Sequence, residues 1–157
     1  MKNYLTKLRE NEEKGFSLVE LIIVMAIMAI LVGVVASQVI PYMEKSRQSK
    51  DQQQLSSLAT NVVSAVAQSG KDVGAFSNVK MSELDTNTTT QNFASTLAEL
   101  AGESTCADYG TTIAGKLTSK QAKGKTNDDI LVSMTAKGVV TVTINGATSD
   151  KLKVESE

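Results

Sequence analysis

The pattern of apolar and polar positions divides the chain near its start. A polar stretch of 15 residues is followed by an apolar run over residues 16–40, in which Glu20 is the only charged residue. As a helix, such a run of 25 residues rises about 37 Å, which exceeds the hydrocarbon core of a bilayer, about 30 Å thick. The pattern therefore predicts a membrane-spanning helix. A carboxylate inside such a segment is costly, so Glu20 is expected to have a partner and a function.

The helical spacing of apolar residues continues beyond this run. They form one stripe, made of Leu55, Leu58, Ala59, Val62 and Val66. This spacing is typical of an amphipathic helix that packs one face against a folded domain. Ser69-Gly70 provides a natural end, because glycine accepts the left-handed conformation that follows many helices. The sequence predicts one helix from about Phe16 to Ser69.

Two residues weaken this predicted helix. Pro41 removes a backbone donor and clashes with the carbonyl four residues earlier, so we expect a kink over residues 37–41. Gly33 costs about 1 kcal/mol relative to alanine. Both residues could allow bending or local melting, or the kink could be an ordinary feature of a membrane helix.

The remaining residues, 71–157, predict a small mixed domain. Gln91–Ala101 shows helical spacing, with Thr89 or Thr90 as its cap. Two segments of alternating side chains then predict two strands. They are Ile130, Val132 and Met134 alternating with Leu131, Ser133 and Thr135, and Val140, Val142 and Ile144 alternating with Thr141 and Thr143.

Two turn signals and two further strands complete this domain. Ala136-Lys137-Gly138 joins the two predicted strands, and Asn145-Gly146 is a strong hairpin signal. Lys151–Glu157 is expected to add a last strand, which gives a three-stranded antiparallel meander. Thr111–Leu117 is predicted as one more strand.

Composition excludes most catalytic schemes. The chain has no histidine and one cysteine, Cys106, so it has no histidine base, no Cys-His pair and no histidine-based metal site. We predict no enzyme activity, no cofactor and no metal. Asp108 with Asp128-Asp129 could indicate a calcium loop, but the spacing does not fit an EF-hand, and a turn before a strand explains Asp128-Asp129 better.

The net charge and the single cysteine indicate no additional binding site. The chain has 16 basic and 17 acidic residues, so no basic excess indicates nucleic-acid binding. Cys106 cannot form a disulfide within one chain. We expect it to be a buried small hydrophobic residue, with intermolecular bonding or a reactive thiol as alternatives.

The segment from Lys14 to Leu21, KGFSLVEL, closely resembles the class III signal sequence of type IV pilins and pilin-like proteins. The resemblance extends over about residues 14–40. It implies that a prepilin peptidase cuts between Gly15 and Phe16 on the cytoplasmic face and N-methylates Phe16. Glu20 then occupies the fifth mature position, where the family has its glutamate.

The resemblance also implies a domain organisation. Residues 1–15 would be the cleaved leader, 16–40 the transmembrane and filament-core helix, 41–70 its amphipathic continuation, and 71–157 the C-terminal globular domain. The fold class would be α+β, the pilin fold, in which a long N-terminal helix packs on a small antiparallel sheet.

By the same resemblance, the chain would be a structural subunit of a type IV pilus used for adhesion or surface motility. It would form a homo-oligomeric helical filament in which Glu20 of an incoming subunit pairs with the amine of Phe16 in the growing fibre. Its partners would be the prepilin peptidase, an assembly ATPase, a membrane platform protein and, before assembly, membrane lipid. The C-terminal domain would lie outside the cytoplasmic membrane, and the assembled filament would be extracellular.

Three alternatives remain open at this point. A pseudopilin of a type II secretion or competence system has the same signal and glutamate, and a minor pilin does too. A monomeric membrane-anchored surface protein would retain residues 1–15 and tolerate loss of Glu20. An ordinary secretory signal peptide fits less well, because the apolar run is too long for one.

Overall fold

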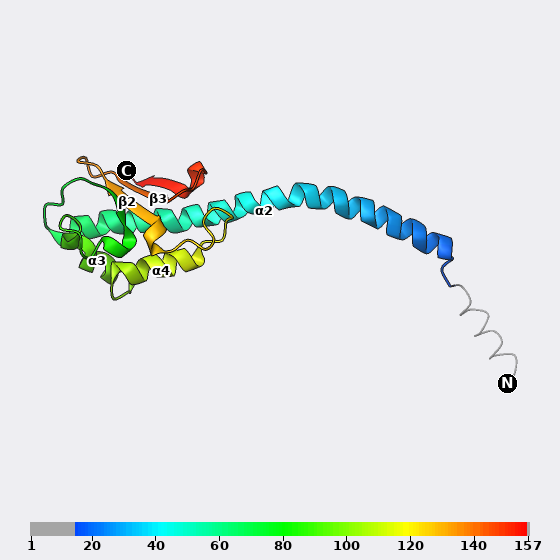
Figure 1. The fold of residues 1–157 in the computed structure, drawn as a ribbon, viewed down its shortest axis with the longest axis horizontal. Coiled ribbons are helices and arrows are strands. Elements are labelled where there is room, and N and C mark those ends of the chain that lie inside the picture. The colour runs from blue at the N-terminus through cyan, green and yellow to red at the C-terminus, as the bar shows by residue number, and fades with distance from the viewer. Residues whose placement is uncertain (1–14, 157) are drawn as a thin grey trace, which may run out of the picture. The chain divides into compact units, whose positions relative to one another are not determined.

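A computed structural model describes residues 15–156, and the chain forms two compact units, Met1–Tyr42 and Met43–Glu157. Helix α2, Leu18–Ser69, starts in the first unit and continues into the second (Figure 1). The predicted long helix is confirmed, although it begins two residues later than expected. Within residues 15–156 it is the one helix that is long and apolar enough to cross a membrane.

Helix α2 continues through Pro41 without interruption. The proline therefore does not end the helix, and the kink expected over residues 37–41 stays a prediction. Nearby, the Ser37 hydroxyl donates a hydrogen bond to the carbonyl of Val34, at 2.8 Å.

The sheet has four antiparallel strands in the order β1-β2-β3-β4. They are β1 (Phe76–Lys80), β2 (Ile130–Met134), β3 (Val140–Ile144) and β4 (Lys153–Ser156). The predicted meander is confirmed as β2, β3 and β4. Strand β4 begins later than expected because Asp150–Leu152 first forms a short 3-10 turn, η3, and Glu157 lies outside the described residues.

Strand β1 was not predicted from the sequence. Asn78 has a positive φ of 51°, and the register with β2 shifts between Phe76 and Val79. The strand therefore buries Phe76 and Val79 with two exposed residues between them, which removes the alternation that identifies a strand. The backbone N–H of Asn78 donates to the hydroxyl of Ser133 on β2, at 2.8 Å.

The expected strand at Thr111–Leu117 is wrong, because these residues lie mainly in helix α4, Cys106–Lys116. The hydroxyl of Thr105 accepts the N–H of Asp108 at 3.1 Å and caps this helix. Its buried residues follow a helical spacing: Cys106, Tyr109, Gly110, Ile113 and Ala114. The period of burial in this segment is that of a helix and not the alternation of a strand.

Helix α3, Gln91–Ala101, has the predicted bounds. Thr90 is its N-cap residue, but its hydroxyl makes no capping bond and instead donates to the carbonyl of Leu84, at 2.8 Å. Gly102 follows the helix with a φ of 74°, as expected of a glycine at a helix end.

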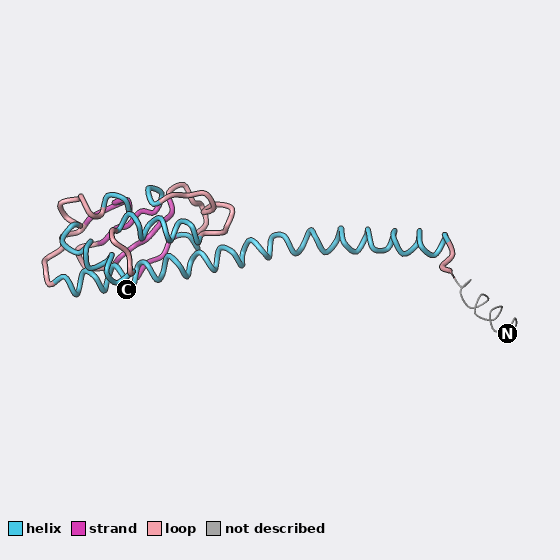
Figure 2. Tube along the Cα trace, turned by 90° about the horizontal axis from the view of Figure 1, so that it is seen from below, coloured by secondary structure: helices cyan, strands magenta, loops and turns pink. Residues whose placement is uncertain are grey.

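The hydrophobic core of the second unit combines the stripe of α2 with the sheet and the two short helices (Figure 2). Leu55, Leu58, Ala59 and Val62 are fully buried, and Val66 is partly buried against the same core. The predicted amphipathic face is therefore confirmed. Burying each such leucine or valine stabilises the fold by about 1.5–3 kcal/mol.

Asp51 of α2 is a fully buried carboxylate that fastens a loop of the domain to the helix. Its two oxygens accept the backbone N–H groups of Thr118 and Ser119 at 2.9 and 2.8 Å. About two turns earlier on the same helix, Glu44 accepts the N–H of Lys120 at 2.7 Å. Consecutive backbone N–H groups make a favourable anion site, so these two carboxylates determine the path of the loop after α4.

We expect Asp51→Ala to destabilise the protein by about 3 kcal/mol, because two buried N–H groups lose a charged acceptor. Thermal unfolding of the detergent-solubilised chain, with hydrogen exchange at Thr118 and Ser119, measures the effect. Gln53→Ala, an exposed change in the same helix, is the matched control. Equal melting temperatures for the two variants would contradict the anchoring role of Asp51.

Candidate processing and assembly site

The predicted cleavage site lies in an exposed segment just before α2. Gly15, Phe16 and Ser17 precede the helix without regular structure, and Phe16 is 90% exposed. A Cβ placed on Gly15 would meet no described atom within 4 Å. Packing within the described chain therefore does not require a glycine at this position.

Ser17 caps the start of α2, and the Glu20 side chain reaches back to the Ser17 backbone. The backbone N–H of Ser17 donates to Glu20 Oε2 at 2.9 Å, and the hydroxyl of Ser17 accepts the N–H of Val19 at 3.3 Å. The carbonyl of Ser17 accepts the N–H of Leu21 at 3.1 Å. These bonds satisfy donors that every helix leaves free at its first turn, so they explain why the helix begins at Leu18.

Sequence reasoning missed Ser17. The pattern Ser-x-x-Glu directly before an apolar run is itself a capping signature, and it was available in the printed sequence. Helix prediction from the apolar run alone extended the helix to Phe16, because Phe16 belongs to that run.

Glu20 lies in the first turn of α2, where the helix dipole favours an anion. Its carboxylate already binds the N–H of Ser17, the residue next to Phe16. The structure thus brings Phe16 and Glu20 to the same helix end. Cleavage after Gly15 would leave a positive amine on Phe16, one residue from the N–H that the carboxylate accepts.

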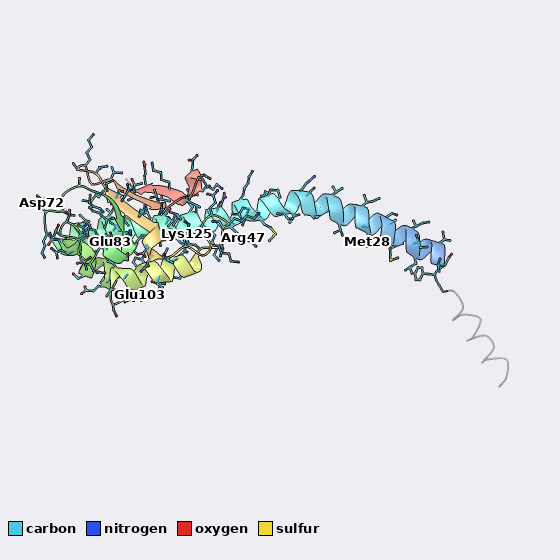
Figure 3. All side chains as sticks on the ribbon, in the orientation of Figure 1. Met28, Arg47, Asp72, Glu83, Glu103 and Lys125 are labelled. Carbon is cyan, nitrogen blue, oxygen red and sulfur yellow. The ribbon has the colours of Figure 1, made fainter. Side chains whose placement is uncertain are left out.

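The apolar residues of the first unit are not buried by any other part of the described chain. The most apolar part of α2 has none of its residues buried, and Met28, labelled in Figure 3, is 58% exposed. A Cβ on Gly33 would likewise meet no atom within 4 Å. An exposed apolar surface of this extent is typical of a segment that contacts a membrane or another protein.

The other residues singled out in the sequence lie in the second unit. Asn127–Asp129 forms a 3-10 turn directly before β2, which confirms the interpretation of Asp128-Asp129 as a turn. Thr126 donates its backbone N–H to Asp129 at 3.0 Å, and this bond lowers the pKa of the Asp129 carboxyl.

Cys106 is fully buried at the start of α4, and its thiol donates to the carbonyl of Ala94 at 3.2 Å. The expectation of a buried small residue is confirmed. Burial, together with the nearby carboxylate of Asp85, raises the pKa of the Cys106 thiol to about 12. The thiol therefore stays protonated near neutral pH, where reactivity requires the thiolate.

We expect iodoacetamide to alkylate Cys106 in the native chain at least about a hundredfold more slowly than in the unfolded chain at pH 8. A raised folded pKa also means that this thiol stabilises the fold below pH 9.0 and that the contribution is lost as the pH rises towards about 12. Mass spectrometry with and without denaturant measures the two rates. Equal rates would show that the thiol is accessible.

Comparison with known families identifies the N-terminal segment. Residues 11–36 match the family model of the prokaryotic N-terminal methylation motif. This match and the long apolar helix show a class III prepilin signal sequence. The observed α+β architecture, a long N-terminal helix followed by a small antiparallel sheet, is consistent with the pilin fold. No curated protein and no solved structure matches the chain.

Proposed function

We propose that this chain, which carries the signal of a pilin-like or pseudopilin protein, is a structural subunit of a type IV pilus. The observation that carries the proposal is the methylation motif at residues 11–36, joined to a helix that leaves its apolar half uncovered. Such a helix requires either lipid or neighbouring helices, and a filament supplies neighbouring helices.

Processing is the first step of the proposed mechanism. A prepilin peptidase would cut between Gly15 and Phe16 and methylate the new amine. The exposure of Phe16 and the start of the helix at Leu18 support this step, because a protease needs an extended segment at the scissile bond. The Ser17 N–H is bound by the Glu20 carboxylate, as is typical of a residue at the start of a helix.

Assembly is the second step. The amine of Phe16 and the carboxylate of Glu20 would both be expensive in an apolar filament core unless each has an opposite charge. Glu20 of an incoming subunit would pair with Phe16 of a subunit already in the fibre. This pairing favours one register between subunits, since a subunit shifted along its axis leaves both charges unpaired.

Burial of the apolar half of α2 against neighbouring subunits would hold the filament together in the aqueous medium. The exposed side chains from Leu18 to Ile40 would pack against the same segment of other subunits. A filament of this kind leaves the second unit in the medium, where its surface would determine adhesion or motility. An assembly ATPase and a membrane platform protein would move subunits from the cytoplasmic membrane into the fibre.

Electron microscopy of fibres sheared from the cell surface tests this proposal. We expect long filaments in which this chain is the main component, and none when the gene is deleted. A chain that stays in the membrane fraction and forms only short fibres would instead identify a pseudopilin of a secretion or competence system. A chain that remains monomeric in the membrane would contradict both assignments.

A further inference from the structure

Two loops of the second unit meet around α2 close to the start of that unit. The loop after α4 is fastened there by the bond from the Lys120 N–H to Glu44, at 2.7 Å. The segment before β4 contacts the next turn, where the ammonium of Lys151 donates to the hydroxyl of Ser49 at 3.0 Å. Gln121 joins the two loops, because its amide oxygen accepts the N–H groups of Thr148 and Ser149, both at 3.0 Å.

This arrangement places five cationic residues close to one another along the axis of α2. We call them the basic collar: Lys45, Arg47 and Lys50 of α2, Lys120 of the loop after α4, and Lys151 of η3. Arg47 is labelled in Figure 3 at one end of the second unit, and Asp72 is labelled at the opposite end. Lys45, Arg47 and Lys50 point to different sides of α2, because each helical residue turns by about 100°.

The collar is not neutralised by the described part of its own chain. The three salt bridges within residues 15–156 involve Lys80, Lys125 and Lys153, none of which belongs to the collar.

Three carboxylates lie near the basic collar. Glu44 and Asp51 are engaged by backbone N–H groups of the loop, and Asp150 is exposed. Five cations against three carboxylates leave a net positive charge, whereas the whole chain carries −1.

A hollow of about 570 Å³ opens within the collar. Its lining consists of Lys45, Gln48, Thr148, Ser149, Asp150 and Lys151. Two ammonium groups, a hydroxyl pair and an amide can bind the oxygens of a phosphate, and the Asp150 carboxylate can accept a hydrogen bond from a hydroxyl group of the same ligand. Volume and chemistry fit the glycerol phosphate headgroup of an anionic phospholipid.

The position of the collar along α2 favours a membrane as the source of that phosphate. Lys45 follows Ile40, the last residue of the apolar run, by five residues of helix, which is a rise of about 7.5 Å. The headgroup layer on each side of the hydrocarbon core is about 5–8 Å thick. A cation within a Debye length of a bilayer surface is attracted to anionic headgroups there, on either face of the membrane.

We infer that the basic collar binds anionic phospholipid, with one headgroup in the hollow between Lys45 and Lys151. The inference rests on the proposed function, in which the subunit resides in the membrane before assembly. Such binding would retain unassembled subunits at a defined depth in the bilayer. It would also have to be released when a subunit enters the fibre.

Lipid retention by the full chain tests the inference. The chain is solubilised with a mild detergent from vesicles containing equal amounts of phosphatidylglycerol and phosphatidylcholine, and bound lipid is measured by mass spectrometry. We expect about tenfold enrichment of phosphatidylglycerol, lost in the double variant Lys45→Gln, Lys151→Gln. The double variant Lys71→Gln, Lys137→Gln removes the same charge at exposed positions outside the collar and should retain the enrichment.

Two outcomes would contradict the inference. Equal enrichment in both double variants would mean that net charge alone selects the lipid. Displacement of the lipid by millimolar inorganic phosphate would show a site for a soluble anion. Because retention is measured without assembly, a collar that fails to select lipid leaves the filament proposal intact. Conversely, lipid selection by a chain that never forms fibres would overturn only the filament proposal.

Discussion

Replacing Glu20 with glutamine is expected to lower filament yield about a hundredfold or more, while cleavage of the leader continues. Breaking a buried charge pair by removing one partner typically costs about 3–5 kcal/mol, because the other charge stays buried and unpaired. Glutamine retains an oxygen that can accept the N–H of Ser17, so the capping bond observed at 2.9 Å can persist. The substitution therefore removes the charge and leaves the cap.

Ser17→Ala is the matched control, because it removes the capping hydroxyl and leaves the carboxylate in place. Loss of such a cap costs about 1 kcal/mol of helix stability, so we expect only a modest drop in yield. Sheared fibre yield, normalised to processed subunit in the membrane, measures both variants. Wild-type yield from Glu20→Gln, or an equal loss from Ser17→Ala, would show that Glu20 acts through the cap and not through its charge.

The second large effect concerns processing. We expect Gly15→Leu to slow cleavage about a hundredfold, because a bulky side chain beside the scissile bond displaces it from the peptidase and small misplacements have large effects on rate. A Cβ at this position meets no described atom within 4 Å. The chain itself therefore tolerates the substitution, and slower cleavage would report recognition by the peptidase.

Gly33→Ala provides the comparison for this experiment, since a Cβ at Gly33 also meets nothing within 4 Å but lies far from the cleavage site in sequence. Its leader should be removed at the wild-type rate. A time course of precursor and product on a denaturing gel follows both variants. Normal cleavage of Gly15→Leu would mean that the peptidase does not require glycine before the cut.

Local patterns were sufficient to predict most of the fold. The apolar run and the stripe from Leu55 to Val66 predicted α2, and alternating apolar residues predicted β2 and β3. These elements depend on the period of burial within one segment. A single sequence displays that period directly.

The elements that failed depend on contacts between distant segments. Strand β1 contains a bulge at Asn78, whose N–H is satisfied by Ser133, 55 positions away. The buried carboxylate of Asp51 binds N–H groups nearly 70 residues later in the chain. A polar residue on a helix gives no sign of such a partner, so neither β1 nor the anchored loop could be predicted from the local pattern.

The candidate site was predicted unevenly. Gly15, Phe16 and Glu20 came from the resemblance of one short segment, and the match at residues 11–36 supports the signal sequence itself. The capping role of Ser17 was visible in the sequence and was missed. The basic collar required the structure, because Lys120 and Lys151 approach α2 only through the two loops.

The most direct test of this account is the intact mass and N-terminal sequence of the chain recovered from sheared fibres. The account predicts a subunit that begins at Phe16 and is heavier by one methyl group on its terminal amine. A chain that retains residues 1–15 would contradict it, because an uncleaved leader leaves no free amine on Phe16 to pair with Glu20.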